Sequence, residues 1–78
     1  MTLEIISAHE VMFKGEADSV TLPGELGQFT VLRNHAPIIS VLVEGKVSYR
    51  TSDGSEKDLS IKGGIADVEN SVVSVCIY

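Results

Sequence analysis

The 78-residue chain contains no tryptophan, only two phenylalanines and two tyrosines, and a single cysteine. Without aromatic bulk the core has to be aliphatic, and the plentiful Val and Ile suit strands. One cysteine cannot form an internal disulfide, and a small domain without disulfides is typical of a reducing compartment. Cys76 lies in the apolar run "VVSVCIY", and we interpret it as a small buried hydrophobic residue.

Basic residues are also scarce, since six Lys and Arg stand against eleven Asp and Glu, for a formal net charge of −5. This balance disfavours nucleic acid and anionic lipid as partners, because both are bound mainly through clustered basic side chains. The longest apolar run, "PIISVLV", is far shorter than the roughly 20 residues that a membrane helix needs. The start "MTLEIIS" has no signal-peptide features. We expect membrane association only through another protein.

The chain offers little that looks like a site for chemistry. Its two histidines, His9 and His35, stand 26 positions apart, without the close ligand spacing that zinc requires. Nucleophile-elbow and phosphate-loop patterns are absent, and the carboxylates are scattered. We therefore predict no catalytic residue, no metal and no cofactor, and we interpret His35 as part of a surface turn.

Short segments of alternating apolar and polar residues predict strands with one buried and one wet face. These segments are "TLEIIS", "KVSYRT", "KDLSIKG" and "SVVSVCIY". "PIISVLVEG" is more continuously apolar, which favours coverage on both faces, with a partner on one of them. No window of eleven residues shows a helical period. The predicted fold is all-β, a single small two-sheet β-sandwich of short, mostly antiparallel strands over residues 1–78.

Turn residues separate these segments. "FKGE" indicates a turn at Gly15, and Asp53-Gly54 suits a tight hairpin between "KVSYRT" and "KDLSIKG", since both residues tolerate positive φ. In "RNHAP", Asn34 tolerates a left-handed conformation and Pro37 stiffens the entry to the next strand.

Three stretches together resemble the F-type ATP synthase epsilon subunit, called delta in mitochondria. The first is "LEIISAHEVMFKGEADSVTLPGELGQFTVLRNHAPIIS", followed by "GKV" at 45–47 and "IKGGIADVENSVVSV" at 61–75. They match the family's "F-x-G-E" turn, its "P-G-x-x-G" and "H-A-P" landmarks and its later "G-G". The matching residues of the first stretch are Phe13, Gly15, Glu16, Val20, Leu22, Pro23, Gly24, Gly27, Phe29, Val31, Leu32, His35, Ala36 and Pro37.

The chain also departs from the family pattern. Arg33 stands where the family usually has Pro, and Ala8 where Pro is common. A typical member continues into a C-terminal helical hairpin, whereas this sequence ends at Tyr78, so we expect a naturally short subunit with that helical domain absent. Inhibition of hydrolysis and ATP binding, which the family assigns to the hairpin, are not expected here.

The resemblance implies a non-catalytic rotor subunit in the central stalk of a proton-translocating ATP synthase. Such a subunit links the gamma subunit to the polar loops of the c-ring, on the cytoplasmic face of the bacterial inner membrane, as a peripheral protein. The alternative is a free-standing β-sandwich module that binds other proteins. By motif match, the c-ring is expected to contact Gly27, Gln28 and Phe29, and gamma to contact Ser7, Arg33, His35 and Ser40. Because Phe29 alternates with Val31, its assignment to core or interface stays open.

Overall fold

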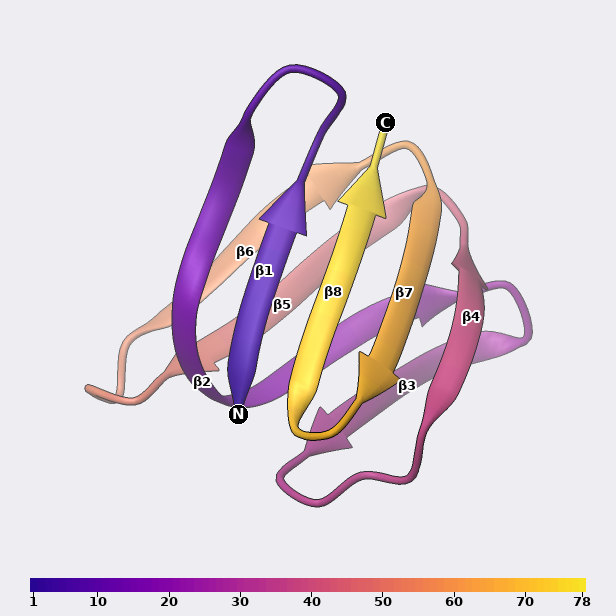
Figure 1. Ribbon diagram of the computed structural model, residues 1–78. Helices are drawn as coiled ribbons and strands as arrows, with labels where there is room; N and C mark the ends of the chain where they lie inside the picture. Colours follow the sequence, from indigo (N-terminus) through magenta and orange to yellow (C-terminus); the bar gives the residue numbers. More distant parts are fainter.

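Eight β-strands and no helix make up the computed structural model, which describes residues 1–78. They pack as two layers, which confirms the predicted all-β sandwich (Figure 1). The strands are β1 (Thr2–Ile6), β2 (Val11–Gly24), β3 (Gly27–Leu32), β4 (Ile38–Leu42), β5 (Gly45–Thr51), β6 (Glu56–Ile61), β7 (Gly64–Glu69) and β8 (Val72–Ile77).

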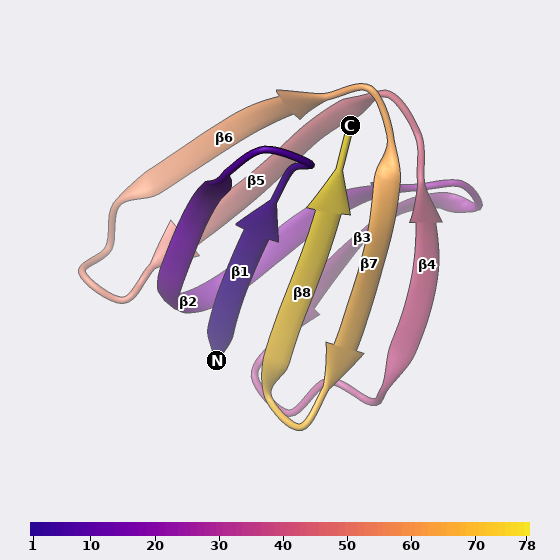
Figure 2. The same cartoon turned by 45° about the horizontal axis from the view of Figure 1, so that its top comes forward.

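One layer consists of β1, β8, β7 and β4, and the other of β3, β5, β6 and the second half of β2 (Figures 1 and 2). Strand β2 serves both layers, because its first half pairs with β1 and its second half pairs with β3 and β5. All pairings are antiparallel except that of β1 with β8, which joins the first and last strands in parallel.

The turn predicted at Gly15 is wrong, because β2 runs through this residue without interruption. Gly15 lies opposite Leu3 of β1, and a Cβ atom built on it would stand 3.2 Å from the Phe13 ring. A single glycine inside a strand marks close packing or a bend more often than a chain reversal. The register of β2 against β5 shifts between Ala17 and Ser19, near the point where the strand changes layers.

Aliphatic side chains fill the space between the layers, as predicted from the alternating segments. Leu3, Ile5, Val47, Val73 and Val75 are all fully buried. The remaining buried hydrophobic residues are Met1, Ala17, Val20, Leu22, Val31, Leu42, Ile61, Ala66 and Val68.

Cys76 is exposed, so our interpretation of it as a buried residue is wrong. The core face of β8 is taken by Val73 and Val75, and successive side chains in a strand point to opposite faces. Cys76 is one position out of phase with these valines and therefore points outward, where its register partners are Ile65 and Ile6.

Two of the predicted turns are confirmed. Asn34 has a φ of 67°, the left-handed conformation that asparagine tolerates. The Asp53-Gly54 pair joins β5 to β6, but only Gly54 has positive φ, at 90°. The Thr51 N–H donates to the Ser55 carbonyl at 2.9 Å, which closes a three-residue loop.

The continuously apolar β4 has only one covered face. Leu42 is buried in the core, whereas the side chains of Ile39 and Val41 are 73% and 50% exposed. The expectation of coverage on both faces is therefore wrong for the chain by itself, and coverage of the outer face by a partner stays a prediction.

Candidate protein-docking surface

A hollow of about 500 Å³ lies between the β2–β3 turn and strand β4. Five of its nine lining residues are hydrophobic. Leu26, at the tip of the turn, is fully exposed, and Ile39 borders the hollow from β4. Exposed apolar side chains gathered around a concavity are typical of a surface that another protein covers.

The β2–β3 turn is shaped by its glycines. Gly27 has a φ of 129°, which side-chain-bearing residues rarely adopt. A Cβ on Gly24 would lie 2.7 Å from the Gly27 carbonyl oxygen and 2.9 Å from the Phe29 ring. Both glycines therefore allow a tight hairpin whose two loop residues, Glu25 and Leu26, project from the sandwich.

The apolar surface continues from the hollow over the outer face of the β4–β7–β8–β1 layer. The register aligns Val41 with Ile65, Ile65 with Cys76, Cys76 with Ile6, and Ile6 with Val11 of β2. These five residues form one row across the strands, which we call the apolar row. Four strand spacings of about 4.8 Å give it a length of roughly 19 Å.

The residues predicted to face the c-ring lie together at the hollow. Gly27, Gln28 and Phe29 all line it. Phe29 is half-buried and packs against the core, because it points to the same side as Val31. It thus belongs to the core and at the same time borders the candidate surface.

The residues predicted to face gamma do not form one group. Ser40 is on β4 and lines the same hollow as the predicted c-ring residues. Arg33 and His35 are exposed in the β3–β4 loop, at the other end of the layer from Ser7, which lies at the β1–β2 turn (Figure 1).

Local contacts account for three of these side chains without any partner. Arg33 forms an exposed ion pair with Asp18 at 3.7 Å. The Ser7 hydroxyl accepts hydrogen bonds from the backbone N–H groups of His9 and Glu10 and so stabilises its turn. His35 contacts the adjacent Ala36 carbonyl through its Nδ1 at 2.6 Å.

Sequence reasoning proposed a partner over the segment that contains Ile39 and Val41, but it missed Leu26 as part of the surface. Leu26 occupies a turn, where polar residues and glycine are usual, and this was a readable signal. For Ile39 and Val41 the signal was the run "PIISVLV", in which Ser40 is the only polar residue, because an alternating strand would have placed polar residues at 39 and 41.

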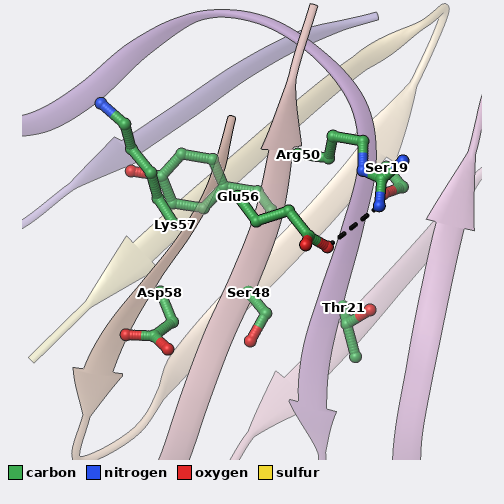
Figure 3. Close-up of a pocket in the computed structure, with 8 residues that line it drawn as sticks. Ser19, Thr21, Ser48, Arg50, Glu56, Lys57 and Asp58 are labelled. Atoms are coloured by element: carbon green, nitrogen blue, oxygen red, sulfur yellow. Dashed lines mark hydrogen bonds and ion pairs between the residues drawn. The ribbon is translucent and has the colours of Figure 1, made fainter. Parts of the chain in front are cut away.

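A second depression, on the outer face of β2, β5 and β6, is polar in character (Figure 3). Arg50 and Glu56 form an ion pair across it at 3.1 Å, and both side chains are mostly exposed. Ser48 and Thr21 lie beside this pair without pointing toward a common centre (Figure 3). This arrangement is that of a solvated sheet face, and it contrasts with the apolar row on the other layer.

The loop between β5 and β6 holds the carboxyl group with the clearest pKa shift. The pKa of Asp53 falls to about 2, first because the Thr51 hydroxyl donates to the carboxylate and then because the Ser55 backbone N–H does so as well. No group of three or more His, Cys, Asp or Glu side chains is placed to hold a metal ion. No helix in the structure has the length and apolar character to cross a membrane.

A β-sandwich with an exposed apolar hollow and row falls in the class of small all-β domains that dock onto other proteins. Residues 1–77 match the protein family described as "ATP synthase, Delta/Epsilon chain, beta-sandwich domain". The chain belongs to this family, which confirms the resemblance derived from its motifs.

Curated relatives of the chain have names that agree with this family. The ATP synthase epsilon chain of Bordetella petrii is 40% identical over 96% of this chain and 53% of that protein. The epsilon chain of Xanthomonas campestris pv. campestris is 42% identical over 95% of this chain and 53% of that protein. The chain therefore spans about half the length of the curated relatives it matches.

Solved structures share the fold. A structure of the Euglena gracilis mitochondrial ATP synthase, described as OSCP/F1/c-ring in rotational state 1, contains a chain that matches with a TM-score of 0.89 at 25% identity. That match covers 96% of this chain and 48% of the other. The central stalk and c-ring structure from Tetrahymena thermophila matches with a TM-score of 0.82 at 15% identity, over 99% of this chain and 62% of the other, which shows a common fold.

Proposed function

We propose that the chain acts in the central stalk of a proton-translocating F-type ATP synthase, as a rotor subunit that links gamma to the c-ring. The observation that carries this proposal is the family match over residues 1–77, with relatives named ATP synthase epsilon chain. In this role the domain catalyses nothing itself. It helps couple proton flow to ATP synthesis at the cytoplasmic face of the bacterial inner membrane, which it reaches only through the complex.

The role is mechanical, and two features of the domain suit it. Close-packed interiors transmit strain, and the core here joins both layers through fully buried aliphatic side chains. The hollow and the apolar row supply contact area on one side, where the c-ring is assigned to Gly27, Gln28 and Phe29. For gamma, Ser40 at the hollow and Arg33 and His35 in the adjacent loop are the favoured contacts, and Ser7 is the weaker candidate.

The first test is co-purification. The tagged chain should bring down gamma and the c-ring from membranes solubilised in mild detergent. A clean preparation that contains neither subunit would contradict the proposal and favour a free-standing binding module.

The second test places a negative charge at the hollow. Gln28→Glu should lower the ratio of ATP made to protons translocated in inverted membrane vesicles, because an unpaired carboxylate is costly to bury in an interface. Ser48→Glu is the matched control, since Ser48 is exposed on the polar face of the other layer. Both variants should be folded by circular dichroism. If they gave the same ratio of ATP made to protons translocated, the assignment of Gln28 to the interface would be wrong.

A further inference from the structure

The outer face of the β1–β8–β7–β4 layer is apolar at one end of its strands and acidic further along. The apolar row crosses it beside the β1–β2 turn, because Ile6 and Val11 are the strand residues on either side of this turn. Residues two positions apart in a strand point to the same face, about 6.8 Å from each other. Two positions from the row, the register aligns Asp67 of β7 with Ser74 of β8, and Ser74 with Glu4 of β1. An acidic line therefore runs parallel to the apolar row.

The carboxylates of this face have little positive charge around them. Strands β1, β4, β7 and β8 contain three acidic residues and no Lys, Arg or His. The three are Glu4, Asp67 and Glu69, which we call the acidic border, and none of them takes part in the ion pairs of the chain. Lys14 of β2 lies opposite Glu4 in the register. An apolar surface with an acidic border is complementary to an apolar partner surface that carries Lys or Arg beside it.

The outer face of the other layer has no such imbalance. Strands β5 and β6 carry three basic and two acidic residues between them. Arg50 and Glu56 pair at 3.1 Å across the two strands. The acidic border is therefore a property of one face and does not follow from the net charge of −5 alone.

The residues assigned to gamma lie around this face. Ser7 follows Ile6 directly, at the end of the apolar row, whereas Arg33 and His35 are in the β3–β4 loop at the opposite end of the layer (Figure 1). Ser40 is on β4, at one side of the same layer. A single partner that contacts both ends of the layer has to lie along the face between them. The residues assigned to the c-ring are contiguous at the hollow and need no such reach.

We propose that the gamma subunit covers the outer face of the β1–β8–β7–β4 layer, with apolar side chains on the apolar row and basic side chains against the acidic border. This inference rests on the proposed function for the identity of the partner. It adds the face that is used and the chemistry that gamma must present there. Burial of the row supplies affinity, and the charges of the border set the orientation and the rate of association.

A second copy of this chain does not fit the same face. Each copy has a net charge of −5, and its own outer face offers carboxylates to the acidic border where basic groups are needed. Like charges brought together across an interface oppose association. The partner must therefore differ in charge from this chain.

The first test uses Cys76, which is the single cysteine and stands third of the five residues in the apolar row. Its reaction with a maleimide should slow at least roughly tenfold when purified gamma is bound, because a covered thiol reacts only after local opening. The control is the double variant Cys76→Ser, Ser48→Cys, which moves the thiol to the exposed polar face of the other layer. This thiol should react at the same rate with and without gamma.

Each other outcome of the thiol test has one meaning. If Cys76 reacts equally fast with gamma bound, the assignment of the face is wrong and the rotor assignment stands. If the wild-type chain does not bind gamma at all, both proposals fail. Protection of Cys76 by the c-ring and not by gamma would assign the row to the c-ring. Protection that grows with the concentration of the chain alone would assign it to a second copy.

The second test removes charge from the border. Asp67→Asn combined with Glu69→Gln should lower the rate of association with gamma at least roughly threefold at low salt, and the remaining rate should depend less on salt. The matched control, Asp58→Asn combined with Glu56→Gln, removes two exposed carboxylates from β6 and should associate like wild type. Equal association rates for the two double variants would contradict a basic complement on gamma.

Discussion

Gly64 should be among the least replaceable residues of the domain, although it lies in no tight turn. It begins β7 opposite Ile77 of β8 and Leu42 of β4. A Cβ atom built on it would stand 2.2 Å from the carbonyl oxygen of Cys76. Ordinary contact begins near 3.4 Å, so Gly64→Ala must move the β8 backbone by about 1.2 Å (3.4 − 2.2).

This displacement sets the size of the expected effect. Backbone shifts forced by an added methyl group in a packed region typically cost about 1 to 3 kcal/mol. We expect the upper end, about 3 kcal/mol, because the atom that has to move is backbone in a strand paired on both sides. For a domain of this size that lowers the melting temperature by roughly 12 to 24 °C.

Circular dichroism melts and urea titrations followed by tyrosine fluorescence measure the effect. Gly15→Ala is the matched control, because its new Cβ would meet only the Phe13 ring at 3.2 Å, and that ring can turn aside. Its free energy of unfolding should stay within about 1 kcal/mol of wild type. If Gly64→Ala melted at the wild-type temperature, the tight spacing between β7 and β8 would not be real.

Two other perturbations have defined outcomes. Leu22→Ala should lower the free energy of unfolding by about 3 kcal/mol, because its side chain is fully buried, whereas Leu26→Ala at the exposed hairpin tip should change it by less than about 0.5 kcal/mol; chemical denaturation measures both, and equal values would contradict the assignment of Leu22 to the core. Asp53→Asn tests the β5–β6 loop through pH. The pKa of Asp53 in the folded chain, about 2, lies below the ordinary pKa of an aspartate, 3.8, so ionised Asp53 stabilises the fold above pH 4 and this contribution is lost as pH falls toward 2. The melting temperatures of wild type and Asp53→Asn should therefore differ at pH 6 and converge near pH 2, and a gap that stays constant with pH would rule out the depressed pKa.

The alternation of residues predicted part of the core. Leu3 with Ile5, and Val73 with Val75, are buried as the period of two requires, because that period is a direct property of extended backbone. The same rule, applied strictly, would have placed Cys76 outside. Its apolar neighbours suggested burial, whereas its phase along β8 decides its position.

Single residues of the hollow carried sequence signals, but its concave shape could not be predicted because it depends on which strands remain unpaired. Nothing local in "IISVL" or "GQFTVL" indicates that both strands keep a free edge, since this depends on where a strand as long as β2 changes layers. The Gly15 error has the same origin, since a glycine that looked like a turn lies inside a 14-residue strand. The residues predicted to contact the c-ring lie together at the hollow because they are contiguous in the sequence. The residues predicted to contact gamma come from separate segments, and the fold places them apart.

The parallel pairing of β1 with β8 has a consequence for how the protein is made. Strand β1 leaves the ribosome well before its partner β8, because β8 spans Val72–Ile77 and is the last strand of the domain to be synthesised. Until β8 emerges, Leu3 and Ile5 of β1 have a paired strand on one side only. The layer of β1, β8, β7 and β4 then lacks the strand that joins β1 to β7. We expect the domain to stay open until β8 has left the ribosome, because the pairing of β1 with β8 joins residues about 70 positions apart.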